Sequence, residues 1–308
     1  MIRRRFECVA GLGLVLLGSL AGAQGAAGEG DPSRTPRVTR AEEEARTIGA
    51  RRAALAAALD RLDGKTYFSL PEITAVEVVQ LADGDLVRRR EPPAAPGEPQ
   101  RVVALQWFDV SRSALWIACQ DPHLRMDDSI ENLRLSPSVE GHTVWYGLID
   151  LPWPFKNRQW VIKVWDHLPL AEATAGESWE HVWQLDLSQM PEALGAIQRG
   201  EAGSLTPSRA EKAVVTPVNH GAWVLIDVDG GTLLIWHLTS SIGGSIPDRL
   251  VVSNAFHSVE RLFRTLERLA RRRVERHYRD DHPPLLGGDG KPIPTYGPPI
   301  VDGKLRRR

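Results

Sequence analysis

Cysteine is nearly absent from this chain, since its 308 residues include only Cys8 and Cys119. If Cys8 belongs to a removed leader, no internal disulfide can form and the core must hold without cross-links. Metal-binding motifs are also missing: there is no His-Glu-x-x-His, no paired-cysteine spacing and no EF-hand loop. No Gly-x-Ser-x-Gly motif is present, and no glycine-rich phosphate loop follows a predicted strand. The sequence therefore predicts no metal, no cofactor and no catalytic residue, which favours a binding protein over an enzyme.

The chain also has no large excess of acidic or basic residues, and its long hydrophobic run is confined to the beginning. The formal net charge of −1 gives no reason to expect a nucleic-acid partner. Arg3 to Arg5 precede an apolar run from Val9 to Leu20, which is followed by Ala21-Gly22-Ala23. This order is typical of a secretory signal peptide, and the run is too short for an ordinary membrane span. We expect a cleaved signal at 1–23, a flexible tether at 24–39 and a periplasmic or secreted protein, with an uncleaved anchor as the alternative.

Tryptophan is the residue that the chain has in unusual supply, with ten against six phenylalanines and four tyrosines. Tryptophan combines a large apolar ring with one polar N–H, so it suits cores, cavities and wet interfaces alike. Apolar periodicity continues to Tyr278, after which the composition becomes rich in proline, glycine and charge. We therefore predict a folded domain at 40–279 and a disordered or loosely draped tail at 280–308.

The order of predicted elements indicates an α+β fold. Apolar alternation and turn signals predict extended segments and strands at 72–81, 85–90, 101–110, 143–150, 158–166, 179–187, 213–217, 222–228 and 232–239. Helices are predicted at 40–62, at 111–119, within 190–209 and from about 248 to 278, with a short helix or irregular turn at 125–132. Strands that precede one long terminal helix favour a sheet with a helical cover.

The last helix has one apolar side. Its apolar residues recur at helical spacing: Val251, Ala255, Val259, Leu262, Leu266 and Leu269. A one-sided helix that follows a hairpin predicts a lid on a curved sheet, and such a lid can enclose a cavity. An apolar ligand is therefore the first functional hypothesis.

Two segments resemble the START lipid-transfer domains of the helix-grip superfamily. The first runs Pro152-Trp-Pro-Phe155 and then Asn157-Arg-Gln-Trp-Val161, and the second is Gly243-Gly-Ser-Ile-Pro247 before the long helix. The resemblance implies a curved antiparallel sheet wrapped around the C-terminal helix, with a cavity for one lipid and possible transfer of that lipid. Gln159 and Trp160 depart from the aspartate and phenylalanine that are common in the family, so the ligand specificity is expected to differ from that of other members.

The predicted site is a lined cavity with a gate. The lining is predicted to consist of Trp145, Trp160, Ile162, Trp183, Trp223, Trp236, Val251, Phe256, Val259 and Phe263. The gate is predicted to consist of Trp153 and Phe155 on a proline-stiffened corner and of Gly243, Gly244 and Pro247 before the helix. Either His181 or His237 could point inward as a polar group of the cavity, although a hydrogen-bonded structural histidine is the simpler interpretation for each.

Three alternatives remain open at the level of the sequence. Related helix-grip proteins include cyclases and hydrolases of apolar substrates, so an enzyme is the first. The second is a cell-envelope interaction module with a filled core, and the third is support for a neighbouring transport system. Arg271 to Arg273 could make transient contact with anionic lipid, although interleaved glutamates favour a solvated helix face. We expect a monomer.

Overall fold

The structure is a computed structural model, and it describes residues 40–120, 130–135, 141–272, 286–293, 300–301 and 304–305. The predicted signal peptide, the tether and most of the predicted tail lie outside the described residues. The helix or turn predicted at 125–132 lies partly outside them as well, and its last residues belong to a strand that begins at Ile130.

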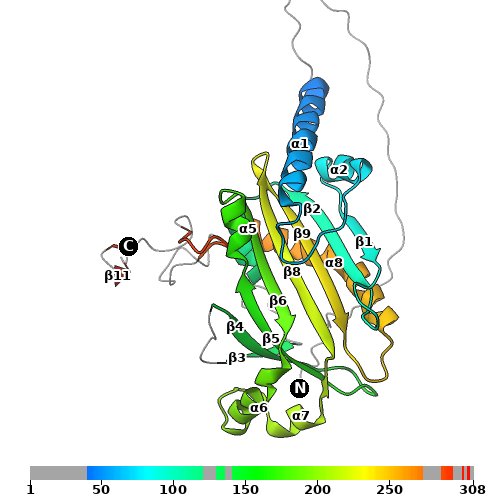
Figure 1. Ribbon diagram of the computed structural model, residues 1–308, viewed down its shortest axis with the longest axis vertical. Coiled ribbons are helices and arrows are strands. Elements are labelled where there is room, and N and C mark those ends of the chain that lie inside the picture. The colour runs from blue at the N-terminus through cyan, green and yellow to red at the C-terminus, as the bar shows by residue number, and fades with distance from the viewer. Residues whose placement is uncertain are drawn as a thin grey trace, which may run out of the picture.

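One sheet organises the chain (Figure 1). Its order is β1-β2-β9-β8-β6-β5-β4-β3, and each of these neighbouring pairs is antiparallel. Two residues of β7 add a short parallel pairing to the start of β5. The strands are β1 (Val87–Glu91), β2 (Arg101–Phe108), β3 (Ile130–Leu135), β4 (Thr143–Ile149), β5 (Arg158–Asp166), β6 (Ser178–Leu185), β7 (Val214–Val215), β8 (Val218–Val228) and β9 (Gly231–Ser241). A separate small pairing joins β10 (Ile300–Val301) to β11 (Lys304–Leu305).

Helices cover both faces of this sheet, which confirms the predicted α+β class. They are α1 (Arg40–Leu62), α2 (Ala75–Ala82), α3 (Arg112–Gln120), α5 (Leu168–Ala173), α6 (Met190–Gln198), α7 (Pro207–Lys212) and α8 (Asp248–Arg272). Figure 1 shows α8 passing behind β9 and β2, with α6 and α7 at the lower end of β3 to β5 and α1 projecting beyond the upper end of the sheet.

The two faces have different partners. We call the face that packs on α8 and α3 the inner face, because it carries the buried cluster that contains Trp223, Trp236 and Phe263. The other, outer face packs on α1 and α2 through Leu55 and Leu81. Below them, α6 and α7 cover the outer face of β3 to β5. Strand alternation separates these clusters, because successive side chains point to opposite faces.

The segment predicted as extended at 72–81 is a helix, α2, so that prediction is wrong. Thr74 accepts a hydrogen bond from the backbone N–H of Glu77, and the Glu77 carboxylate accepts one from the backbone N–H of Thr74. This reciprocal capping box starts a helix by satisfying two backbone donors that would otherwise lack partners. Its sequence signature, Thr-x-x-Glu before an apolar run, outweighs the β-branched residues that suggested a strand.

Residues 286–293, which lie within the predicted tail, pack on the core. The indole N–H of Trp116 donates to the backbone oxygen of Leu286 at 3.1 Å, and Ile293 is buried. A methyl group at Gly288 would lie 2.5 Å from Trp179, so only glycine allows this close approach. The turn at 286–293 therefore packs over the rings of Trp116 and Trp179.

Candidate functional site on the inner face

The register of the sheet brings the six predicted lining residues from strands to one face. Trp145 pairs with Ile162, and Trp223 pairs with Trp236. Because directly paired residues point to the same side of an antiparallel sheet, the pairings from β4 to β9 place the whole set on the inner face. The set is Trp145, Trp160, Ile162, Trp183, Trp223 and Trp236.

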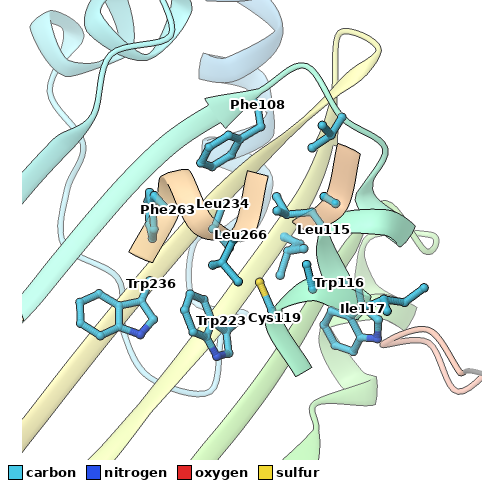
Figure 2. Packing of buried hydrophobic residues seen from close by; sticks show 14 of the residues in the cluster. Phe108, Leu115, Trp116, Ile117, Cys119, Trp223, Leu234, Trp236, Phe263 and Leu266 are labelled. Carbon is cyan, nitrogen blue, oxygen red and sulfur yellow. The ribbon is translucent and has the colours of Figure 1, made fainter. Parts of the chain in front are cut away.

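Four of the ten predicted lining residues are ordinary core residues. Trp223, Trp236, Val259 and Phe263 have exposed fractions of 0 to 6%, and they pack in one cluster with Phe108 and Leu234. Figure 2 shows Phe263 and Leu266 of α8 above the strands that carry Leu234, Trp236 and Trp223. The part of the inner face under α8 is therefore filled by side chains.

The first turn of α8 departs from the predicted apolar stripe. Val252 is buried in the inner cluster, whereas Val251 is only half-buried and lies outside that cluster. Phe256 is half-buried against the cluster, and the guanidinium groups of Arg88 and Arg90 lie over its ring. Val251 is thus replaced by Val252 as the residue that packs on the sheet.

The described elements cover the other part of the inner face less completely. The helix α8 packs mainly on β1, β2, β9 and α3, and the inner face of β4, of β5 and of the second half of β6 lies beyond that contact. There the apolar side chains are only partly buried, whereas Trp179 at the start of β6 is a core residue. The outer-face neighbours Val144, Tyr146 and Val161 are buried. We call this partly buried set the tryptophan floor: Trp145, Trp160, Ile162, Val164, Trp183 and Leu185.

Two glycines allow the tryptophans of the floor to lie flat. Gly147 pairs with Trp160 and Gly221 pairs with Trp183 across neighbouring strands. A methyl group would lie 2.4 Å from the Trp160 indole at Gly147 and 2.4 Å from the Trp183 indole at Gly221. Each ring therefore occupies the space of a missing side chain, a role that an isolated glycine within a strand pattern can signal.

The floor is continuous with the buried core. The ring centroids of Trp183 and Trp223 lie 6.3 Å apart, and those of Trp223 and Trp236 lie 6.0 Å apart. The indole N–H of Trp183 donates to Asn219 Oδ1 at 3.1 Å, which fixes the orientation of that ring. The aromatic row thus runs without a break from the tryptophan floor to the part of the inner face under α8.

The structure brings the two predicted gate elements together through Arg158. This side chain is 2% exposed, and its guanidinium donates to the backbone oxygens of Ile242 at 2.6 Å and Gly243 at 3.0 Å. It also donates to the oxygens of Lys156 and Asn157 in its own corner. Gly243 and Gly244 both have positive φ angles, as the turn before α8 requires. The predicted hinge is therefore held by a buried arginine.

The tip of the corner points into solvent. Trp153 is 92% exposed and Phe155 is 43% exposed, and Pro247 at the other gate element is exposed as well. Below the tip, Asn157 bonds to Asp150 and accepts from the backbone N–H of Leu151. The corner is thus a tied loop that presents a large aromatic side chain to its surroundings.

Gln159 has a structural role that explains its amide. Its Nε2 donates to the backbone oxygens of Ala210 and Ala213 at the end of α7, and its Oε1 accepts from the hydroxyl of Tyr146 at 3.0 Å. A carboxylate cannot donate to carbonyl groups, so an aspartate or glutamate would leave them without these bonds. Burial raises the pKa of Tyr146 to about 12, which keeps this hydroxyl a donor at neutral pH.

The two candidate histidines have opposite surroundings. His181 is on the inner face, where its Nδ1 lies 2.6 Å from Asp166 Oδ1. His237 is fully buried on the outer face, and neither of its ring nitrogens has a hydrogen-bond partner among the residues that the structure describes. Strand alternation alone could have separated them, because His181 shares its parity with Trp183 whereas His237 alternates with Trp236.

Other features of the described residues point to no second site. Two surface hollows, of about 380 and 310 Å³, lie beside β3 and between α1 and α2, and neither includes a predicted lining residue. Within the described ranges, no group of three or more His, Cys, Asp and Glu side chains is placed to hold a metal ion. None of the helices described is long and apolar enough to span a bilayer.

Comparisons with known proteins give structural similarities only. No family model matches the chain, and no curated protein matches it. Human STARD10 is 11% identical, with a TM-score of 0.46 over 61% of this chain and 70% of that one. Human StAR-related lipid transfer protein 5 is 12% identical, with a TM-score of 0.45 over 74% and 98%. A STAR-related lipid transfer protein from Xanthomonas axonopodis is 16% identical, with a TM-score of 0.44 over 61% and 94%.

Proposed function

We propose that this protein binds an apolar small molecule of lipid character on the tryptophan floor. The observation that supports this proposal is a contrast within β4 and β5: Val144, Tyr146, Leu148 and Val161 on the outer face are buried, while Trp145 and Trp160 on the inner face are only partly buried. A contiguous apolar surface that stays partly accessible to water commonly marks a binding site. The edge of α8 and the corner that carries Trp153 border this surface and would close over the bound molecule.

The energetics favour a ligand with a long hydrocarbon part. Burial of one methylene group is favourable by about 0.8 kcal/mol, so a chain of roughly a dozen carbons supplies enough gross energy without any ionic contact. Selectivity would then come from the shape of the floor and from a few polar groups beside it. Binding of this kind needs no catalytic group, and transfer between membranes would follow from reversible opening at the corner.

The place of action is part of the proposal. The arginines, the apolar run and the small residues at 1–23 support export to the periplasm or the outside. We further propose that the protein acts as a monomer, with the floor occupied by its ligand and not by another protein. An enzyme of the cyclase or hydrolase type and an interaction module remain the competing functions.

Substitution on the floor is expected to weaken binding of oleic acid. Trp160→Ala removes an inner-face ring, and a loss of about 2 kcal/mol corresponds to roughly thirtyfold weaker binding. The matched control is Trp165→Ala on the same strand, because Trp165 pairs with Val182 on the outer face and packs on Tyr67. Oleic acid binding to each variant is measured by calorimetry, and Trp165→Ala is expected to bind like the unchanged protein.

Native mass spectrometry of protein purified from its natural compartment provides the second measurement. A co-purifying lipid is expected. If no lipid co-purifies and added lipids change neither the heat of mixing nor the tryptophan fluorescence, the proposal of an apolar ligand is wrong. Equal losses in Trp160→Ala and Trp165→Ala would place binding elsewhere than the floor.

We also propose that the corner makes transient contact with membranes. Trp153 is 92% exposed on a tied loop, and tryptophan partitions favourably into the interfacial region of a bilayer. Trp153→Ala is expected to reduce binding to phosphatidylcholine vesicles about tenfold, as a cosedimentation assay would measure. The free energy of unfolding should change by less than about 0.5 kcal/mol, because the ring is not part of the core.

The control for this prediction is Val76→Ala, which truncates another exposed apolar side chain, 70% exposed on α2. Its vesicle binding is expected to match that of the unchanged protein. A Trp153→Ala variant that still cosediments with vesicles as well as the Val76→Ala variant would show that the corner does not dock on membranes.

A further inference from the structure

A polar pair lies at the edge of the tryptophan floor. Asp166 at the end of β5 and His181 on β6 are paired residues on the inner face, and His181 Nδ1 lies 2.6 Å from Asp166 Oδ1. Their side chains are 29% and 19% exposed, so solvent or a ligand can reach them. Trp183 follows His181 by two residues on the same face, and Val164 precedes Asp166 by two. The pair therefore adjoins the apolar surface directly.

The Asp166 carboxylate determines which nitrogen of His181 can bind a ligand. An ionised carboxylate only accepts hydrogen bonds, so it selects the imidazole form in which Nδ1 carries the proton. In neutral imidazole the other nitrogen, Nε2, is then a hydrogen-bond acceptor. Among the described residues, His181 bonds to Asp166 through Nδ1, and its ring lies 5.9 Å from the Trp116 ring. In this form of the imidazole, Nε2 can accept a hydrogen bond from a ligand.

The helix α3 borders the pair with an aromatic ring. The Trp116 ring lies 5.9 Å from the His181 ring and 5.3 Å from the Trp179 ring. Arg112, one turn earlier on α3, lies over the Trp179 ring. The polar pair is therefore set among apolar rings, with the hydrocarbon surface of the floor beginning at Trp183.

We propose that His181 forms a subsite for a hydroxyl group, and that the ligand is an apolar alcohol. A hydroxyl group can donate a hydrogen bond to His181 Nε2, which accepts when Nδ1 carries the proton. Its hydrocarbon part would extend over Trp183 and the rest of the floor. Asp166 is a positioning residue, because it acts on the ligand only through His181. This inference rests on the proposed apolar ligand and specifies its polar end.

A catalytic role for the pair is less well supported. A histidine and an aspartate supply two members of a nucleophilic triad, but the third must bond to Nε2. Within the described residues no serine, threonine or cysteine makes that bond to His181. The neighbouring rings of Trp116, Trp179 and Trp223 are apolar and buried, so they bring no reactive group to the pair.

The test compares dodecanol with dodecyl methyl ether, which has the same chain but cannot donate a hydrogen bond. The unchanged protein is expected to bind dodecanol about tenfold more tightly than the ether, as one oriented hydrogen bond allows. His181→Phe keeps an aromatic ring and removes the acceptor, so its affinity for dodecanol should fall to that for the ether while ether binding is unchanged. Asp166→Asn should reduce the ratio of the affinity for dodecanol to the affinity for the ether, since the amide no longer selects one form of the His181 imidazole.

Each outcome has a distinct meaning. Equal affinities for the two probes in the unchanged protein overturn the hydroxyl subsite and leave the apolar ligand intact. A preference for dodecanol that persists in His181→Phe also overturns it. Binding of neither probe, together with no binding of oleic acid, refutes the apolar ligand and with it the subsite. If His181→Phe does not fold, the ratio of the affinities for dodecanol and the ether still tests the subsite, because it can be compared between Asp166→Asn and the unchanged protein.

Discussion

Replacement of Arg158 by methionine is expected to lower the free energy of unfolding by about 3 to 5 kcal/mol. The arginine is 2% exposed and bonds to backbone oxygens of the corner and of the turn before α8. Methionine has a comparable length but no donor, so the carbonyl groups of Ile242 and Gly243 lose their partner. Urea unfolding followed by circular dichroism measures the difference.

The control is Arg199→Met, which removes an arginine whose side chain is 51% exposed and paired with Glu192 and Glu201. Exposed ion pairs contribute less than about 1 kcal/mol, so this variant should remain close to the unchanged protein. A loss in Arg158→Met no larger than in Arg199→Met would mean that the corner and the turn are not joined by this side chain. In that case the gate elements would move independently.

The second large effect is an acid sensitivity that depends on His237. Burial, reinforced by Arg101 and His220, lowers the pKa of His237 from 6.5 to about 3. The folded state therefore keeps His237 neutral while the unfolded state takes up a proton below 6.5. Because the unfolded state binds the extra proton, stability falls as the pH drops from 6.5 towards 3, by roughly 1 kcal/mol per pH unit.

Comparison of His237→Leu with the unchanged protein isolates this contribution. Urea unfolding at about pH 7 and at about pH 4 should show a smaller loss of stability in the variant, by roughly 2 to 3 kcal/mol. At neutral pH the variant should be at least as stable, since leucine removes two buried nitrogens that lack hydrogen-bond partners among the described residues. His257→Leu, on the exposed side of α8, is the control and should keep the full acid dependence. Equal acid losses in the two variants would contradict the assignment.

Much of the fold could be predicted from local sequence patterns. The first helix spans Arg40–Leu62, as its composition indicates, and the hairpin of β8 and β9 turns at Asp229-Gly230 as its turn chemistry requires. Both features depend on residues that are close in sequence. The helix α2 was missed because β-branched valines mask a capping box, which shows that a terminal signal can outweigh the propensity of a short segment.

The candidate site could be predicted only in part. Strand alternation determines the face of the sheet on which a side chain lies, but it does not determine which helix packs over that side chain. The inner-face positions of Trp145, Trp160 and Trp183 follow from period two along each strand. The helix α8 packs over Trp236 and does not reach Trp160. This difference depends on where α8 crosses the sheet, and no local sequence pattern encodes that position. The pairing of Asp166 with His181 depends likewise on the register across α5.

The contacts of α8 with the first strands have a consequence for how the protein is made. Arg88 on β1 donates to the backbone oxygen of Phe256 on α8 at 3.1 Å, across 168 positions of the chain. Trp116 reaches Leu286 across 170 positions. Contacts so distant in sequence carry a high loop-closure cost and form late, so folding is expected to be slow. During synthesis Trp223 and Trp236 would stay uncovered until α8 emerges, and in that interval the nascent chain is most exposed to aggregation and most dependent on chaperones.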